Sequence, residues 1–229
     1  MVSLTPAEFI KKFCVDFPCL DHHFTGPPQN QQAQGHGSVF QVEGKILAGL
    51  AAKVGGPILE VGADQGVSTR YLHEGLARHP SSRQALIYSV DNNHKWPEDR
   101  AWPLRYRVGG DSANYVPPVK CRLAFIDGDH RYLGVHFDIM NATFTCGITK
   151  LLFHDTAEHF DKVPTNASDG SEARRAVLDT LKEKDWDLYE VSTPCGLIYA
   201  VKKEPAAAPV LVCSDPSAGS GGCCDGVAF

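Results

Sequence analysis

The 229 residues of the chain are 43% hydrophobic and 21% charged, a composition that favours one globular domain with a substantial core. A net charge of −5 without a stripe of Lys or Arg argues against a nucleic-acid or membrane-surface partner. The eight cysteines form no C-x-x-C pair, which favours reduced thiols over disulfides or a zinc site. Without a secretion signal or an apolar run of membrane-spanning length, we expect a cytoplasmic protein.

The chain begins with the signature of a helix start. Thr5, Pro6 and Glu8 match the N-cap, the first helical position and a capping box. The apolar pattern then breaks at residues 19–37, which are rich in Gly, Pro, Gln and Asn. A loop of this length in a compact domain is typical of either a lid or a disordered segment. We therefore expect residues 1–37 to form an N-terminal helix and a lid-like loop over the acceptor site.

A predicted helix over 39–52 precedes the most informative stretch, from Ile58 to Arg70. An apolar run leads to Glu60, two glycines follow at 62 and 66, and apolar residues then recur at helical spacing, which predicts strand, tight turn and helix. We expect Val67, Tyr71, Leu72 and Leu76 to line one face of that helix. Glycine allows the turn to approach a ligand closely, and Glu60 suits a ligand with a cationic end. An ordinary strand–turn–helix corner is the alternative interpretation.

The remaining pattern alternates strands and helices. Strands are expected at 85–90, 104–108, 122–126 and 150–153, a helix at 171–182, and a closing hairpin at 186–191 and 197–201. This predicts an α/β, Rossmann-like fold over residues 38–203, with seven mostly parallel strands, helices on both faces and an antiparallel last strand. Residues 204–229, rich in Pro, Ala, Gly and Ser, are expected to form a flexible tail.

Acidic residues follow three of these strands. Asp91 closes the second strand, where a carboxylate can accept both hydroxyls of a ribose, although a turn residue is the alternative. Asp127 and Asp155 follow two later strands, and parallel strand ends meet at one edge of the sheet. Because adjacent carboxylates repel, we expect a cation between them, with Arg131 as the local rival and solvated loop acids as the alternative.

The stretch Leu59-Glu60-Val61-Gly62-Ala63 through Gly66 and Ser68 resembles the first motif of class I methyltransferases that use S-adenosylmethionine (SAM), in particular the catechol O-methyltransferase group. Phe125 to Tyr132 and Phe153 to Thr156 resemble the family-24 methyltransferase domain, so the resemblance spans about residues 38–202. It implies SAM as cofactor. The residues it implies for SAM binding are Glu60, Gly62, Ala63, Asp64, Gly66, Ser68, Asp91, Asp111, Ser112 and Asp127.

The same resemblance implies a divalent metal, Mg²⁺ or another, with Asp127, His154 and Asp155 as ligands, although some relatives carry a carboxylate at position 154. Imidazole suits Mn²⁺, Fe²⁺ or Zn²⁺ better than Mg²⁺. Three alternatives stay open: a softer metal, a Mg²⁺ site that uses Asp129, or no metal with His154 as base. His130 lies where catechol-type relatives carry a catalytic lysine, so the candidate catalytic residues are His130, His154 and Asp129.

The predicted activity is O-methylation of a small hydroxylated acceptor, such as a sugar, a phenol or a natural product. A SAM-binding protein without catalytic activity, acting as a partner subunit, is the alternative. A nicotinamide dehydrogenase is disfavoured because the G-x-G-x-x-G spacing is absent. A homodimer is compatible with the sequence.

Overall fold

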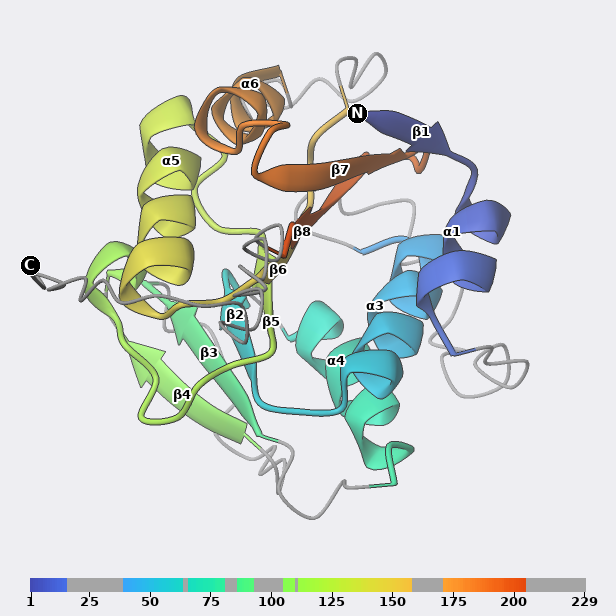
Figure 1. Ribbon diagram of the computed structural model, residues 1–229. Helices are drawn as coiled ribbons and strands as arrows, with labels where there is room; N and C mark the ends of the chain where they lie inside the picture. The colour runs from blue at the N-terminus through green and yellow to red at the C-terminus, as the bar shows by residue number, and fades with distance from the viewer. Residues whose placement is uncertain are drawn as a thin grey trace, which may run out of the picture.

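The computed structural model describes residues 1–15, 39–63, 66–80, 86–92, 105–109, 111–157 and 171–204. The predicted loop at 19–37, Asp64 and nearly all of the predicted tail lie outside the described residues. The described elements form one eight-stranded sheet with helices on both faces (Figure 1).

The sheet has the strand order β1-β7-β8-β6-β5-β2-β3-β4. Neighbouring strands are parallel except at β8, which is antiparallel to both β6 and β7. The predicted Rossmann-like sheet with an antiparallel last strand is therefore confirmed. Its strands are β1 (Val2–Leu4), β2 (Ile58–Val61), β3 (Ile87–Asp91), β4 (Arg105–Gly109), β5 (Leu123–Ile126), β6 (Lys150–Phe153), β7 (Trp186–Val191) and β8 (Leu197–Lys202).

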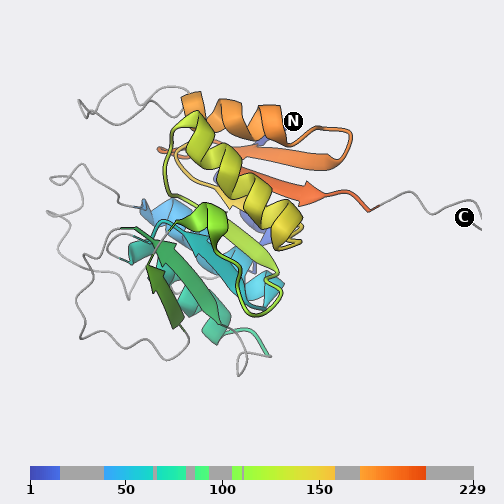
Figure 2. The same ribbon diagram turned by 90° about the vertical axis from the view of Figure 1, so that its left-hand side faces the viewer.

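Helices cover the sheet in two layers, because the central strands are apolar on both faces. Along β2, Ile58 packs into one core and Leu59 into the other. The first core lies under α1 (Pro6–Phe13), α3 (Gln41–Val54) and α4 (Val67–Ala77). The second lies under α5 (Tyr132–Met140) and α6 (Ser171–Thr180), which run side by side in Figure 2. A 3₁₀ turn, η3 (Ser112–Asn114), and a π-helical turn, η4 (Asn141–Thr145), complete the elements.

The N-terminus joins the sheet through β1, a strand that was not predicted. Its three residues pair in parallel with β7, from Val2 opposite Tyr189 to Leu4 opposite Val191. A strand this short shows no readable alternation, which explains why the pattern missed it. The predicted capping box of α1 is confirmed: Glu8 N–H donates to Thr5 Oγ1 at 3.3 Å, and Thr5 N–H donates to Glu8 Oε2 at 2.8 Å.

Helices α3 and α4 approach each other closely through small residues. A Cβ atom at Gly75 would lie 2.1 Å from the carbonyl oxygen of Ala48, so this crossing requires glycine. Three of the predicted core residues of α4 are buried, namely Tyr71, Leu72 and Leu76, but Val67 is 38% exposed. Val67 is the first residue of the helix and is therefore less covered than the other three. Among the described residues, no helix is long and apolar enough to cross a membrane.

Candidate active site at the carboxyl edge of the sheet

The turn after β2 packs directly against the loop after β5. Gly62 has a φ of 80°, and a Cβ there would lie 2.0 Å from the carbonyl oxygen of Asp127. Its N–H donates to Val90 O at 2.9 Å, and Asp127 N–H donates to Val61 O at 2.8 Å. Glycine is needed at position 62 both for the left-handed backbone and for this close approach. The predicted glycine turn therefore lies directly against the start of the motif from Phe125 to Tyr132.

Asp91 lies at the end of β3, beside this turn. Its Oδ2 accepts a hydrogen bond from Ala63 N–H at 2.8 Å, and the residue is buried. This bond fixes the carboxylate next to the glycine turn, where a ribose is expected. The ribose contact itself stays a prediction.

The carboxylate of Glu60 points away from solvent and binds three hydroxyl groups. Ser68 Oγ donates to Oε1 at 2.8 Å, Thr69 Oγ1 donates to Oε2 at 2.7 Å, and Ser89 Oγ donates to Oε2. The residue is 0% exposed. Glu60 and Ser68, both predicted to bind the cofactor, thus bind each other and tie β2 to α4 and β3. A direct cofactor contact of either side chain stays a prediction.

Asp111 and Ser112 occupy the start of η3. Asp111 Oδ1 accepts from Ala113 N–H at 3.0 Å, so Asp111 is the N-cap of this turn. Ser112 Oγ donates to Asp138 Oδ1 at 2.6 Å. Burial raises the pKa of Asp138 to about 6 in spite of the hydrogen bond from Ser112. The adenine contact implied by the family resemblance stays a prediction.

Two carboxylates and two imidazoles converge where β5 and β6 end. His154 Nδ1 lies 3.2 Å from Asp127 Oδ1 and 3.2 Å from Asp155 Oδ1. His130 Nε2 lies 3.2 Å from Asp127 Oδ1 and 3.3 Å from Asp155 Oδ2. We call these four residues the acid–imidazole cluster. The expected convergence of the two aspartates at one edge is thus present, with a histidine on each side of the pair.

The cluster supplies its own counter-charge. Burial would raise the pKa of Asp127, but the charge of His154 and hydrogen bonds from both histidines lower it to about 2. Burial would lower the pKa of each imidazole, but the aspartates raise the pKa of His130 and raise that of His154 well above its ordinary value. Asp155 has a φ of 53°, a left-handed conformation that is uncommon outside glycine and is found at functional sites.

Arg131 and Asp129 lie outside this cluster. Arg131 donates to both carboxylate oxygens of Asp129, the shortest bond being 2.6 Å, and its side chain is 76% exposed. The guanidinium therefore does not fill the space between Asp127 and Asp155, as the rival interpretation required. The Mg²⁺ alternative through Asp129 receives no support from these contacts.

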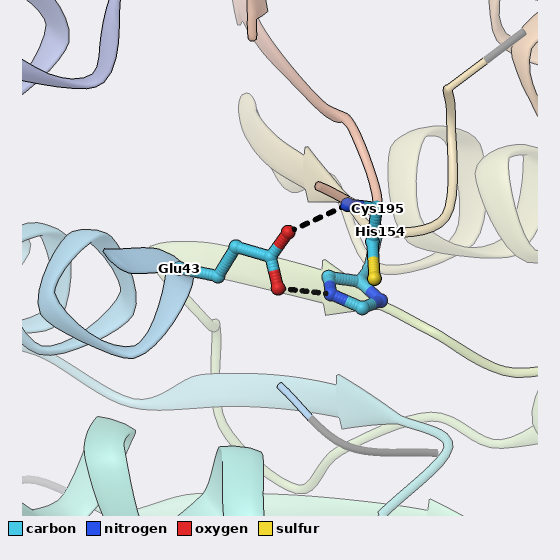
Figure 3. A group of neighbouring side chains, drawn as sticks. All are labelled: Glu43, His154 and Cys195. Carbon is cyan, nitrogen blue, oxygen red and sulfur yellow. Dashed lines mark hydrogen bonds and ion pairs between the residues drawn. The ribbon is translucent and has the colours of Figure 1, made fainter. Parts of the chain in front are cut away.

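A glutamate that the sequence did not mark as a side-chain site residue contacts His154, one member of the cluster (Figure 3). Glu43 Oε2 lies 3.1 Å from His154 Nε2, and Oε1 accepts from Cys195 N–H at 3.0 Å. Oε2 also accepts from Phe40 N–H at 2.9 Å, half of a capping box at the start of α3. The only sequence signal was an acid in the first turn of a helix.

Three members of the cluster fit a divalent cation. Asp127, His130 and Asp155 each offer one ligand atom, all within 4.8 Å of one another. Adjacent ligands of an octahedral ion with bonds of about 2.1 Å are about 3 Å apart, close to the 3.2 and 3.3 Å separations found here. The mixed nitrogen and oxygen donors suit Mn²⁺, Fe²⁺ or Zn²⁺ better than Mg²⁺.

A second group, Glu43, His154 and Cys195, also brings its ligand atoms within 4.8 Å of one another. The Glu43 carboxylate already has three nitrogen partners. Burial raises the pKa of the Cys195 thiol to about 11, which keeps it protonated at neutral pH. The second group is thus held together by hydrogen bonds of Glu43 to His154 and to the backbone of Cys195.

The sequence matches no protein-family model and no curated protein. Solved structures do resemble the fold. Cofactor-bound Rv0187 from MTB has a TM-score of 0.59 at 18% identity, over 77% of this chain and 86% of that chain. The Podospora anserina methyltransferase PaMTH1, solved with bound SAH, has a TM-score of 0.58 at 13% identity, over 73% of this chain and 80% of that chain.

A third similar structure is the O-methyltransferase TomG from Streptomyces achromogenes, involved in tomaymycin synthesis and solved with SAM. It has a TM-score of 0.55 at 14% identity, over 87% of this chain and 96% of that chain. At these identities the comparison establishes the fold: the chain has the Rossmann-like fold of class I SAM-dependent methyltransferases. The class I resemblance seen in the sequence is confirmed at this level.

Proposed function

We propose that this protein transfers a methyl group from SAM to a hydroxyl group of a small molecule. The observation that carries the proposal is the meeting of two motifs at one sheet edge. The Gly62 turn packs on the backbone of Asp127, and the side chain of Asp127 belongs to the acid–imidazole cluster. A cofactor at the turn would therefore lie next to ionisable groups that can handle a hydroxyl proton. Similar folds solved with SAM or SAH support SAM as that cofactor.

The chain offers a consistent set of groups for the cofactor. The turn at Gly62 and Ala63 approaches a ligand with backbone alone, and Asp91 is held beside it by Ala63 N–H. A carboxylate at this strand end is suited to ribose hydroxyls. We propose that the adenine of SAM binds near the start of η3, where Ser112 donates a hydrogen bond to Asp138. Methyl transfer is an in-line displacement, so the main task of these residues is to orient the donor.

The acid–imidazole cluster is the proposed place for the acceptor hydroxyl. Asp127, His130 and Asp155 are partly exposed, whereas His154 is buried behind them. We propose that Asp127, His130 and Asp155 hold a divalent cation, with His154 Nδ1 directed at the same two carboxylates. Such a cation would lower the pKa of an acceptor hydroxyl. In a cation-free enzyme, His130 is the exposed imidazole that can take the hydroxyl proton.

Two measurements test the proposal. Calorimetry with SAM, S-adenosylhomocysteine and NAD should give binding of the first two only. Turnover with a panel of sugars, phenols and catechols is then measured after exhaustive chelation and after adding Mg²⁺, Mn²⁺ and Zn²⁺ in turn. Loss of activity in chelator, with recovery in Mn²⁺ or Zn²⁺, supports the cation. Full activity in chelator would leave His130 as the base. SAM binding without methylation of any acceptor would contradict the proposal that the protein is an enzyme.

A further inference from the structure

The carboxylate of Glu43 joins three segments that are distant in sequence. Phe40 N–H and the ring of His154 meet Oε2, and Cys195 N–H meets Oε1. The residue is 0% exposed, so these nitrogen partners rather than water stabilise its charge. Because both oxygens are held, the carboxylate cannot rotate without losing a hydrogen bond.

This geometry restricts the ring of His154. An ionised carboxylate only accepts hydrogen bonds, so the ring nitrogen that faces Glu43 at 3.1 Å has to carry a hydrogen. That nitrogen is Nε2, and the partner of one ring nitrogen determines the role of the other. The remaining nitrogen, Nδ1, lies 3.2 Å from both Asp127 and Asp155.

We infer that Glu43 is a positioning residue for His154: it holds the hydrogen on Nε2 and so directs Nδ1 at Asp127 and Asp155. The inference rests on the proposed function only for the purpose of this alignment, which is methyl transfer. Glu43 is well placed for the task because it sits on α3, which the contact between Gly75 and Ala48 holds against α4. A group on a packed helix is held more accurately than one on a loop.

The variant Glu43→Gln tests this directly. An amide has one accepting oxygen and one N–H₂ group, so it cannot accept from Cys195 N–H on one side and from His154 on the other. Side-chain ¹⁵N–¹H spectra of the histidines, assigned with His154→Gln, should show a protected Nε2–H signal of His154 in the wild-type protein. We expect that signal to be lost or strongly shifted in Glu43→Gln. Turnover should fall at least about tenfold, while the SAM dissociation constant changes less than about twofold.

Glu8→Gln is the matched control. Glu8 is the third residue of α1, and its Oε2 accepts from Thr5 N–H at 2.8 Å, as that of Glu43 does from Phe40 N–H. This control makes the same change at the same capping position without touching the cluster, so the His154 signals and turnover should equal those of the wild-type protein.

An unchanged His154 Nε2–H signal in Glu43→Gln would overturn the inference. If that variant does not fold, Glu43→Asp is measured instead. Its carboxylate lies one methylene further from the ring, so an unchanged signal there has the same meaning. If the wild-type protein methylates no acceptor, the proposed function fails, but the spectra still decide whether Glu43 positions His154.

Discussion

Two fully buried glutamates, Glu60 and Glu43, lie near the same edge of the sheet and are stabilised differently. Glu60 binds the hydroxyls of Ser68, Thr69 and Ser89, which carry no charge. Glu43 binds N–H groups, one of them on the imidazole of His154, whose pKa is raised. The hydroxyl bonds of Glu60 tie β2, which leads into the glycine turn, to α4 and β3, whereas Glu43 is bonded to an imidazole whose pKa is raised.

The groups bonded to Glu43 and its neighbours should make the stability of the fold depend on pH. The pKa of Asp127 is lowered to about 2 and that of His154 is raised. Asp127 therefore contributes stability that is lost as pH falls from about 4 towards 2. His154 contributes stability that is fully present below about 6.5 and is lost as pH rises through its folded-state pKa.

The largest expected effect is on turnover, from Asp155→Ala. This change removes one carboxylate from the acid–imidazole cluster and leaves the hydroxyl bonds of Glu60 in place. Turnover should fall by at least about a hundredfold, the usual size of an acid–base contribution, while the SAM dissociation constant stays within about twofold. Steady-state kinetics and calorimetry measure the two quantities.

Asp155→Asn separates charge from backbone strain in this experiment. Asparagine tolerates the left-handed φ of 53° better than alanine does. If the carboxylate is what matters, Asp155→Asn should lose nearly as much activity as Asp155→Ala. An active Asp155→Asn would mean that only the backbone geometry at this position is required.

The next effect is on folding, from Gly62→Ala. Its Cβ would meet the carbonyl oxygen of Asp127 at 2.0 Å, with φ at 80°. Gly147→Ala is the control, since its φ is 64° and nothing lies within 4 Å of its Cβ. The control should cost only the left-handed strain, about 1–2 kcal/mol, and Gly62→Ala clearly more. Urea unfolding of both variants measures this, and equal losses would mean that the two motifs do not constrain each other.

Elements whose contacts lie close together in the chain, or whose residue pattern repeats, could be predicted from the sequence. Lys150–Phe153 was predicted with its observed bounds, and the fold class follows from the alternation of strands and helices. Glu60 takes two of its partners from the first turns of the next helix, eight and nine residues on. These contacts could have been predicted from the spacing, but Glu60 was interpreted as a ligand-binding group because it precedes a glycine turn.

The contacts of Glu43 were beyond such reasoning. Its partners His154 and Cys195 lie 111 and 152 residues away, and only the folded sheet brings them together. For Asp127 and Asp155 the rule that parallel strands end at one edge was sufficient. The expected cation between them stays a prediction, and the contacts of His130 and His154 with both carboxylates were not foreseen.

A smaller effect is expected on cofactor affinity, from Asp91→Ala. Loss of charge-assisted hydrogen bonds to the ribose, roughly 1.5–3 kcal/mol each, should weaken SAM binding by about tenfold or more. Asp91→Glu, which keeps the charge, should lie between the wild-type protein and the alanine variant. Calorimetry measures this affinity. An unchanged dissociation constant in Asp91→Ala would mean that the ribose does not bind at the end of β3.

The smallest expected effect is a gain of stability at high pH, from Asp138→Asn. Burial raises the pKa of Asp138 from an ordinary value of 3.8 to about 6. Folding therefore loses stability at this residue as pH rises from about 4 through 6, and the difference in pKa corresponds to about 3 kcal/mol. Asparagine cannot ionise, and its oxygen can still accept from Ser112 Oγ, which donates to Asp138 at 2.6 Å. The buried amide also needs acceptors for its own N–H₂ group, so we expect a net gain of about 1 kcal/mol.

The pH dependence distinguishes this gain from a general change in packing. Urea unfolding of the variant and the wild-type protein is compared at pH 4 and pH 8, and the contributions of Asp127 and His154 cancel in the difference. At pH 8 the variant should be more stable, because only the wild-type protein carries a buried charge at position 138. At pH 4 the native Asp138 is protonated, so the advantage should disappear. An equal difference at both pH values would show that the carboxyl of Asp138 keeps an ordinary pKa.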